Sequence, residues 1–390
     1  MNLNLFDRNS NRNILIAGIF ALIIGVGVSR FAFTSLLPSM LENQLTITSA
    51  GLMASFNFIG YLSGAIFSIF LKSIKIKVLF FRIGLFLSIL TTLILAFSTN
   101  DLLWIISRII AGFGSAMLLI VTGSLVMLKL DMKDKTKAMG IHFSGIGMAI
   151  VFCELISQYT LQYYSWNIVW FVLVIFSIIF TTYSMYIINF NKDNSKIKKT
   201  YMVSKDMFSS YVILLIIAYF TQGIGFVVQG TFLPDIINNI NKIDSYGSVV
   251  WLFVGVSGIP ASIIWMRLAY KYGSENIIII AMLLQIVGIL IPTFTNNLYI
   301  NIISGILYGS TFIGLVALFM NKAGQISKNN PVIIMGSMTA AYGIGQVLAP
   351  LYSIYFINKY ENYNFTLYIT ASIVFLGVLL IFIAKNKYKK

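Results

Sequence analysis

The chain alternates long apolar segments with short polar connections along its whole length. The first apolar segment, residues 14–37, contains a single charged side chain, Arg30. A helix rises about 1.5 Å per residue, so this segment is long enough to cross a hydrocarbon core of about 30 Å. Twelve such segments predict an all-α polytopic membrane protein. Its predicted transmembrane helices span residues 13–38, 48–71, 78–98, 102–128, 138–162, 166–190, 209–236, 246–269, 276–295, 298–321, 331–357 and 364–384.

The polar connections alternate in charge. All but four of the 27 lysine and arginine residues lie in the two terminal tails and in every second connection. The other connections hold only Lys242 and Lys359, while Arg30 and Arg108 lie inside predicted helices. Because cytoplasmic loops are rich in lysine and arginine, this pattern predicts that both termini lie in the cytoplasm. The net charge of +15 is therefore a topology signal, and we expect no nucleic-acid partner.

Composition narrows the function classes that suit this chain. Hydrophobic residues make up 58% of it and charged residues 10%, whereas soluble domains carry about 25% charged residues. The single cysteine, Cys153, excludes an intrachain disulfide, and the single histidine, His142, leaves no Cys/His metal cluster. No P-loop follows a strand pattern, and the apolar segments hold no nucleophile with a matching base. We expect no metal, no cofactor, no catalytic residues and no enzyme activity.

The sequence also divides into two related halves. The longest polar stretch, which includes NKDNSKIKK, separates six predicted helices from six. One constant offset places Gly27 on Gly223, Pro38 on Pro234, Gly51 on Gly247 and Gly140 on Gly336. Self-similarity at a fixed offset indicates duplication, and paired six-helix repeats around a midplane substrate site are a transporter plan. We predict six-helix bundles at residues 1–190 and 208–390, joined by a cytoplasmic linker at 191–207.

Four ionisable side chains lie well inside the predicted helices: Arg30, Arg108, His142 and Glu154. A charge at the centre of a bilayer costs at least about 2.5–3.5 kcal/mol, so such residues face a cavity or a partner. Arg30 and Glu154 both lie about 25 Å along their helices from the cytoplasmic side. Depth alone therefore makes them suitable partners. His142 lies close to a basic connection, and we interpret it as an interfacial residue.

The charge balance of the first half leads to a substrate prediction. It contains two buried arginines against one buried carboxylate, and the second half adds only neutral polar groups. Arginine keeps its proton, and its planar guanidinium suits carboxylate or phosphate. We therefore expect an anionic or carboxylate-bearing solute to bind Arg30 as its main anchor. The other predicted substrate-binding residues are Thr34, Arg108, Gln222 and Gln229.

Glu154 and Pro38 have roles that the sequence leaves less defined. Glu154 is either the partner of Arg30 in a structural ion pair or the proton-coupling group of a transport cycle. Pro38 follows the arginine segment, and we expect it to end the first helix near the outer face.

Two motifs are similar to those of a known family. RIIAGFGSA, residues 108–116, resembles the helix 4 motif of the major facilitator superfamily, with Arg108, Gly112 and Gly114 in the matching places. GVGVSRFAFTSLLPSM, residues 25–40, is similar to the helix 1 signature of the bacterial YbfB/YjiJ-type branch. The connection between helices 2 and 3 departs from the family because it lacks the Asp and Gly of the gating motif. Helix 5 lacks the Gly-Pro pair on which an antiporter assignment would rest.

The resemblance implies two six-helix halves that work by alternating access, with a cavity lined by helices 1, 4, 7 and 10. It also implies a multi-pass protein of the bacterial cytoplasmic (inner or plasma) membrane. We predict a secondary active transporter for a small organic solute, monomeric in membrane lipid, with protons as coupling ion or by exchange. A proton-coupled drug efflux pump is the alternative, since 31 phenylalanines and 16 methionines could line an apolar cavity. The third hypothesis is a membrane receptor that transports nothing.

Overall fold

The computed structural model describes residues 5–45, 47–71, 73–131, 135–189, 209–241, 246–326, 331–360 and 362–387. The predicted linker, residues 191–207, lies outside these ranges. Within them the chain is helical and forms no strand. Twelve helical stretches of the described chain are long and apolar enough to cross a membrane, as the hydrophobic pattern predicts.

Two of these spans combine α-helical and π-helical parts. The first span consists of α1 (Asn11–Leu22), the π-helical η1 (Ile23–Phe31) and α2 (Ala32–Asn43). The fourth span consists of α5 (Asp101–Ala116), the π-helical η2 (Met117–Val121) and α6 (Thr122–Lys129). The other spans are α3 (Ile47–Ile69), α4 (Ile74–Phe97), α7 (Lys135–Leu161), α8 (Trp166–Ile187), α9 (Ser210–Asn241), α10 (Tyr246–Tyr272), α11 (Ser274–Leu290) with the short 3-10 turn η5 (Ile291–Thr293), α12 (Leu298–Ile326), α13 (Pro331–Tyr360) and α14 (Asn364–Lys387).

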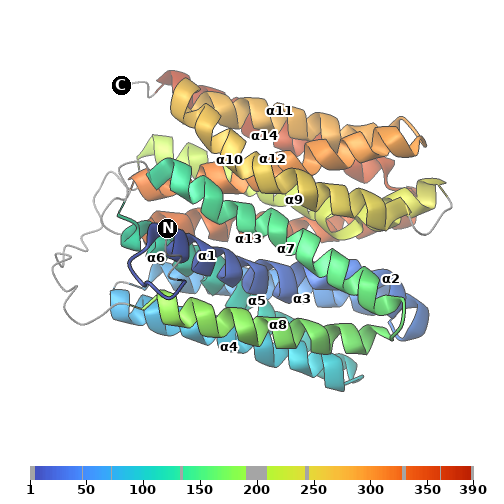
Figure 1. Cartoon of the computed structure of the whole chain (residues 1–390). Helices are drawn as coiled ribbons and strands as arrows, with labels where there is room; N and C mark the ends of the chain where they lie inside the picture. The colour runs from blue at the N-terminus through green and yellow to red at the C-terminus, as the bar shows by residue number, and fades with distance from the viewer. Residues whose placement is uncertain are drawn as a thin grey trace.

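The helices lie side by side in one elongated bundle (Figure 1). Helix α1 begins and helix α14 ends at the same end of this bundle, on the left of the picture. We call this the terminal end and the opposite one the far end. The far end carries the last turn of α2 and the last turn of α7 (Figure 1).

Helices α1–α8 meet helices α9–α14 along a seam formed mainly by two pairs, α3 with α13 and α7 with α10. In the middle of the seam, a Cβ atom on Gly147 would lie 2.6 Å from the Ile259 nitrogen, so only glycine allows the two backbones to come this close. Nearer the terminal end, the Ser262 hydroxyl donates a hydrogen bond of 2.9 Å to the Gly140 carbonyl. The halves are therefore in direct contact at the terminal end of the seam.

Pro38 does not end the first span, which corrects the expectation from the sequence. Helix α2 continues to Asn43, five residues beyond the proline. The proline nitrogen cannot donate to the Thr34 carbonyl, but membrane helices tolerate this loss where neighbouring helices surround the site. Thr34 and Ser35 are both buried beside that turn.

Candidate functional site

The arginine of the first span lies on a π-helical segment. All nine residues of η1 are buried, and the Ser29 hydroxyl donates to the Ile24 carbonyl, five residues earlier, at 3.2 Å. A π-helix is wider than an α-helix and is found mostly as short insertions inside α-helices, frequently at functional sites. Gly25 gives this wide segment room, since a Cβ there would lie 2.4 Å from the Cβ of Leu118. The segment presents Arg30 near its end.

Arg30 is surrounded by aromatic rings. Its side chain is 8% exposed, and its guanidinium carbon lies 4.4 Å from the ring centroid of Tyr61. The same carbon lies 5.3 Å from the centroid of Phe58 and 5.6 Å from that of Phe226. Aromatic faces attract a desolvated cation, which offsets part of its burial cost. The Nη2 atom has no hydrogen-bond partner in the described chain, so the guanidinium keeps a donor for a ligand.

Arg108 is held more rigidly than Arg30. It is 2% exposed, and its Nη1 atom donates to the Ser29 carbonyl at 3.0 Å. The Asn57 amide donates to the Arg108 carbonyl at 3.0 Å and to the Ser29 carbonyl at 3.3 Å. Gly112 allows this arrangement, because a Cβ there would lie 2.0 Å from the Asn57 carbonyl oxygen. Spans 1, 2 and 4 are therefore joined at one point beside both arginines.

The two guanidiniums line one small, partly open pocket. Its polar lining comes from Arg30, Thr34, Asn57, Arg108 and Thr231. Its remaining lining is apolar and consists of Phe31, Phe33, Ala54, Phe58, Phe226 and Gly230. No acidic side chain belongs to this set of described residues. The pocket therefore combines two fixed positive charges with four phenylalanine side chains.

A family model described as "Uncharacterised MFS-type transporter YbfB" matches residues 22–382 of this chain. The chain belongs to this transporter family. The crystal structure of the human organic anion transporter MFSD10 (TETRAN) is similar, with a TM-score of 0.75 and 13% sequence identity. The match covers 95% of this chain and 99% of the human chain, and at that identity it establishes the fold alone.

These findings confirm the predicted major facilitator fold and the family resemblance. The YbfB-type protein is a multi-pass membrane transporter and not an enzyme. Its motif at residues 108–116 supplies Arg108 and Gly112, which take part in the contact between spans 2 and 4 described above.

The structure brings together three of the predicted site residues of this YbfB-type transporter. Arg30, Thr34 and Arg108 all line the pocket. The two glutamines of α9 are buried but are not among its lining residues. The Gln229 amide donates to the Gly288 carbonyl at 3.3 Å and so is directed toward α11.

Glu154 lies apart from the pocket. It is 2% exposed, and its Oε1 atom accepts a hydrogen bond of 3.1 Å from the Gln158 amide. The same amide group lies 3.3 Å from the Ser248 hydroxyl on α10. Arg30 and Glu154 are both described, and no ion pair joins them in this conformation. Their shared depth along the membrane thus does not bring them into contact.

His142 is fully buried inside the bundle, with 0% of its side chain exposed. Glycines account for this burial, since a Cβ on Gly18 would lie 2.6 Å from the His142 Nδ1 atom. The missing side chain on span 1 leaves the space that the imidazole fills.

The sequence reasoning missed the neutral residues around the arginines, chiefly Asn57, Tyr61 and Phe226. Asn57 was detectable, because an amide inside an apolar span needs hydrogen-bond partners. Tyr61 and Phe226 gave no signal, since aromatic side chains inside membrane helices usually pack against other helices or lipid.

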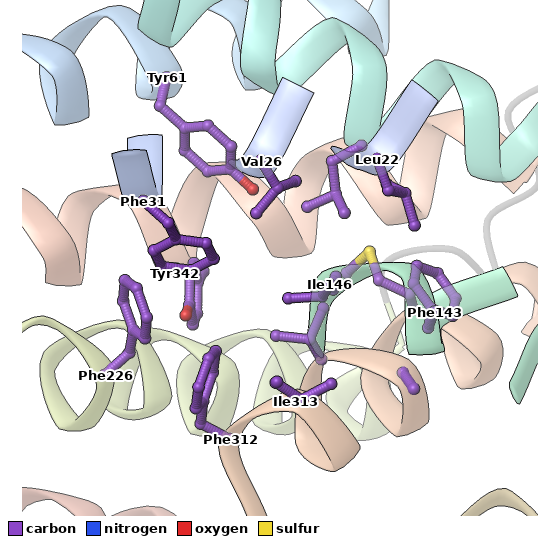
Figure 2. Packing of buried hydrophobic residues seen from close by; sticks show 14 of the residues in the cluster. Leu22, Val26, Phe31, Tyr61, Phe143, Ile146, Phe226, Phe312, Ile313 and Tyr342 are labelled. Atoms are coloured by element: carbon purple, nitrogen blue, oxygen red, sulfur yellow. The ribbon is translucent and has the colours of Figure 1, made fainter. Parts of the chain in front are cut away.

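The apolar side chains between Arg30 and the terminal end fill the seam. Leu22 and Val26 lie one to two turns below Arg30 along span 1, and both are buried. They face the part of the seam that also contains Ile146 and Ile313 (Figure 2). This packing separates the pocket from the terminal end in the described conformation.

Proposed function

We propose that this YbfB-type transporter carries small organic anions across the bacterial cytoplasmic membrane by alternating access. The observation that carries the proposal is the pair of buried guanidiniums facing one pocket without an acidic residue in its described lining. Arginine cannot lose its proton at physiological pH, so a bound anion is the simplest source of the missing negative charge. In this proposal the protein works as a monomer with both termini in the cytoplasm.

The two arginines have different roles in this proposal. Arg108 already donates a hydrogen bond to the Ser29 carbonyl, so it would attract a bound anion mainly through the electrostatic field of its charge. Arg30 keeps its Nη2 donor, and a carboxylate placed there would form a charge-assisted hydrogen bond. The ring faces of Phe33, Phe58 and Phe226 would contact the apolar part of the solute. The preferred substrate is therefore a carboxylic acid with a compact apolar or aromatic body.

The closed terminal end bears on the side of the membrane from which solute would reach the pocket. Basic residues concentrate at that end, which is typical of the cytoplasmic side. Because apolar side chains fill the seam between Arg30 and this end, the conformation described here is closed to the cytoplasm. In this proposal the state described here receives solute from the outside.

Thermal unfolding of the purified transporter in the presence of carboxylic acids, amino acids and neutral sugars tests the proposal. We expect stabilisation by carboxylates alone, since a ligand at one hundred times its Kd stabilises by about 2.7 kcal/mol. Counterflow of the best carboxylate in liposomes then separates a transporter from a receptor. A response limited to neutral sugars would refute the anion proposal.

In this proposal Glu154 is the group that couples transport to protons. It is the sole buried carboxylate in the described chain, and it lies on α7 near the far end of the seam. Replacing Glu154 by Gln keeps its size and hydrogen bonding but removes its titration. We expect this variant to lose accumulation driven by a pH gradient while it retains exchange of the carboxylate identified above.

Uptake into proteoliposomes, with and without a pH gradient, measures this difference. Glu42→Gln is the matched control, because Glu42 is exposed at the end of the same bundle. Accumulation that persists in Glu154→Gln would show that another group carries the proton.

Export of amphipathic drugs is the second candidate, and the phenylalanine lining favours it. The two guanidiniums would repel cationic drugs, so the version that the pocket supports is export of amphipathic anions. Binding of cationic dyes that Arg30→Ala leaves unchanged would favour a general drug pump over the organic anion carrier.

A further inference from the structure

His142 is the only histidine of the chain, and the proposed function does not use it. Its imidazole is fully buried, and neither ring nitrogen has a hydrogen-bond partner in the described chain. Buried polar groups are nearly always hydrogen-bonded, because leaving one unpaired is costly. A buried histidine without a partner is therefore expected to gain one in another state of the protein.

The Nε2 side of the ring faces the seam between the two halves. A Cβ placed on Gly123 would lie 3.9 Å from the Nε2 atom, 3.8 Å from Phe143 and 3.7 Å from the Cε atom of Met335. Met335 belongs to α13, on the other side of the seam. The small space left by Gly123 is thus bounded by the imidazole on one side and by the second half of the protein on the other.

The charged side chains on the helices around His142 are engaged elsewhere. Arg12 on α1 contacts the Asn13 amide, Lys129 on α6 donates to the Ile187 and Asn189 carbonyls, and Lys135 donates to the Met127 carbonyl. Lys137 on α7 lies 5.0 Å from the Tyr270 ring.

Two further charges on these helices lie far from the ring. Lys359 on α13 is at the far end, beside Tyr355 and Tyr360. Glu154 is twelve residues further along α7, about 18 Å away.

On α10 and α12, which also pack against α7, Arg267 is exposed, Lys271 lies 4.9 Å from the Tyr272 ring and Lys322 pairs with Glu275. Among the described residues no charged side chain contacts the ring, so a proton on it would have no counterion in this conformation.

We propose that His142 is a proton-binding group that becomes accessible from the terminal end when the two halves separate there. The inference rests on the alternating access of the proposed function. With the seam closed, Met335 and Phe143 keep water from Nε2 and the imidazole is neutral. When α13 moves away from Gly123, water reaches the ring and its free nitrogen takes up one proton. The helix that holds Glu154 near the far end thus holds a second proton acceptor near the terminal end.

The single histidine allows a direct test by nuclear magnetic resonance. Protein carrying ¹⁵N-histidine, prepared without a histidine tag, gives one pair of imidazole nitrogen signals that report protonation. A disulfide between cysteines at Ser68 and Gly336 would hold the terminal end closed, since a Cβ on Gly336 lies 2.6 Å from the Ser68 hydroxyl. Cys153 is replaced by alanine in every variant, so that the engineered pair is the only one.

We expect the oxidised, cross-linked protein to keep a neutral imidazole between about pH 5 and 8. After reduction the signal should titrate with a midpoint near the ordinary value of about 6.5. Ser68→Cys alone, taken through the same oxidation, is the control and should titrate like the reduced protein. The same titration curve in both states, or a neutral ring in both, would overturn the proposal.

A second measurement covers the case in which the cross-linked protein does not fold. Spin labels at Phe70, directly after α3, and at Tyr272 on α10, both exposed at the terminal end, report its opening as a distance. Uptake of one proton by the open state should shift the open-to-closed ratio by up to about tenfold per pH unit, with opening favoured at low pH. His142→Gln should reduce this dependence, and the exposed control Glu42→Gln should keep it.

The outcome is independent of the substrate. If His142→Gln leaves the pH dependence unchanged, the histidine proposal fails even when carboxylates still stabilise the protein. If carboxylates fail to stabilise it, the organic anion proposal fails whatever the histidine does.

Discussion

Replacing Arg30 by alanine is expected to reduce carboxylate-dependent stabilisation strongly, because it should weaken carboxylate binding by about 10- to 100-fold. The estimate follows from the loss of one charge-assisted hydrogen bond, worth about 1.5–3 kcal/mol. Arg30→Lys keeps the charge but loses the planar fork, so we expect an intermediate affinity. Binding is measured by thermal unfolding across a series of ligand concentrations, and transport by counterflow in liposomes.

The control for Arg30→Ala is Lys75→Ala, which removes the same charge from an exposed position on α4. It should leave binding unchanged. Carboxylate affinity and transport rate that are the same in Arg30→Ala and in the wild type would refute the role of Arg30. A variant that unfolds at a much lower temperature but binds carboxylates normally would assign Arg30 to structure alone.

Replacing Gly112 by alanine is expected to cause one of the largest losses of stability among the glycine-to-alanine changes near the pocket. The new Cβ would lie 2.0 Å from the Asn57 carbonyl oxygen and 2.8 Å from the Tyr61 nitrogen, so the backbones of α3 and α5 must separate. Overpacking of this kind costs about 1–3 kcal/mol or more. The shift also moves Asn57 and Tyr61, both of which lie beside the arginines. We therefore expect weaker carboxylate binding in addition to a lower unfolding temperature.

Gly51→Ala on α3 is the matched control for this variant. A Cβ there meets no atom within 4 Å, and alanine is a better helix former than glycine. Its unfolding temperature should equal that of the wild type or exceed it slightly. If Gly112→Ala unfolds at the same temperature as Gly51→Ala, α3 and α5 do not pack as closely as described.

The sequence was sufficient to predict the helical architecture and the centre of the candidate site, because both depend on strong energetic constraints. Long apolar segments in a polytopic protein can only be membrane helices, and the cost of burying Arg30 and Arg108 marks them as functional or paired. Both of them, together with Thr34, line the pocket.

The rotation of each helix about its axis, which decides what its side chains contact, could not be predicted in the same way. Depth along a span follows from residue counts, but rotation about the helix axis depends on packing against neighbours. Glu154 has the depth of Arg30, yet its carboxylate faces Gln158, and Gln229 faces the Gly288 carbonyl. The burial of His142 depended on a glycine of another span, which one sequence does not reveal as a contact.

The unbalanced charge of the pocket has an electrical consequence. In the proposed transport cycle, an empty pocket lined by two guanidiniums carries positive charge as its exposure changes from one side of the membrane to the other. Each elementary charge that crosses the full field gains or loses about 2.3 kcal/mol per 100 mV. An inside-negative potential therefore favours the empty pocket facing the cytoplasm, and a bound monoanion weakens that preference by one charge. The membrane voltage acts most strongly on the return of the unloaded carrier, so its turnover should depend on voltage.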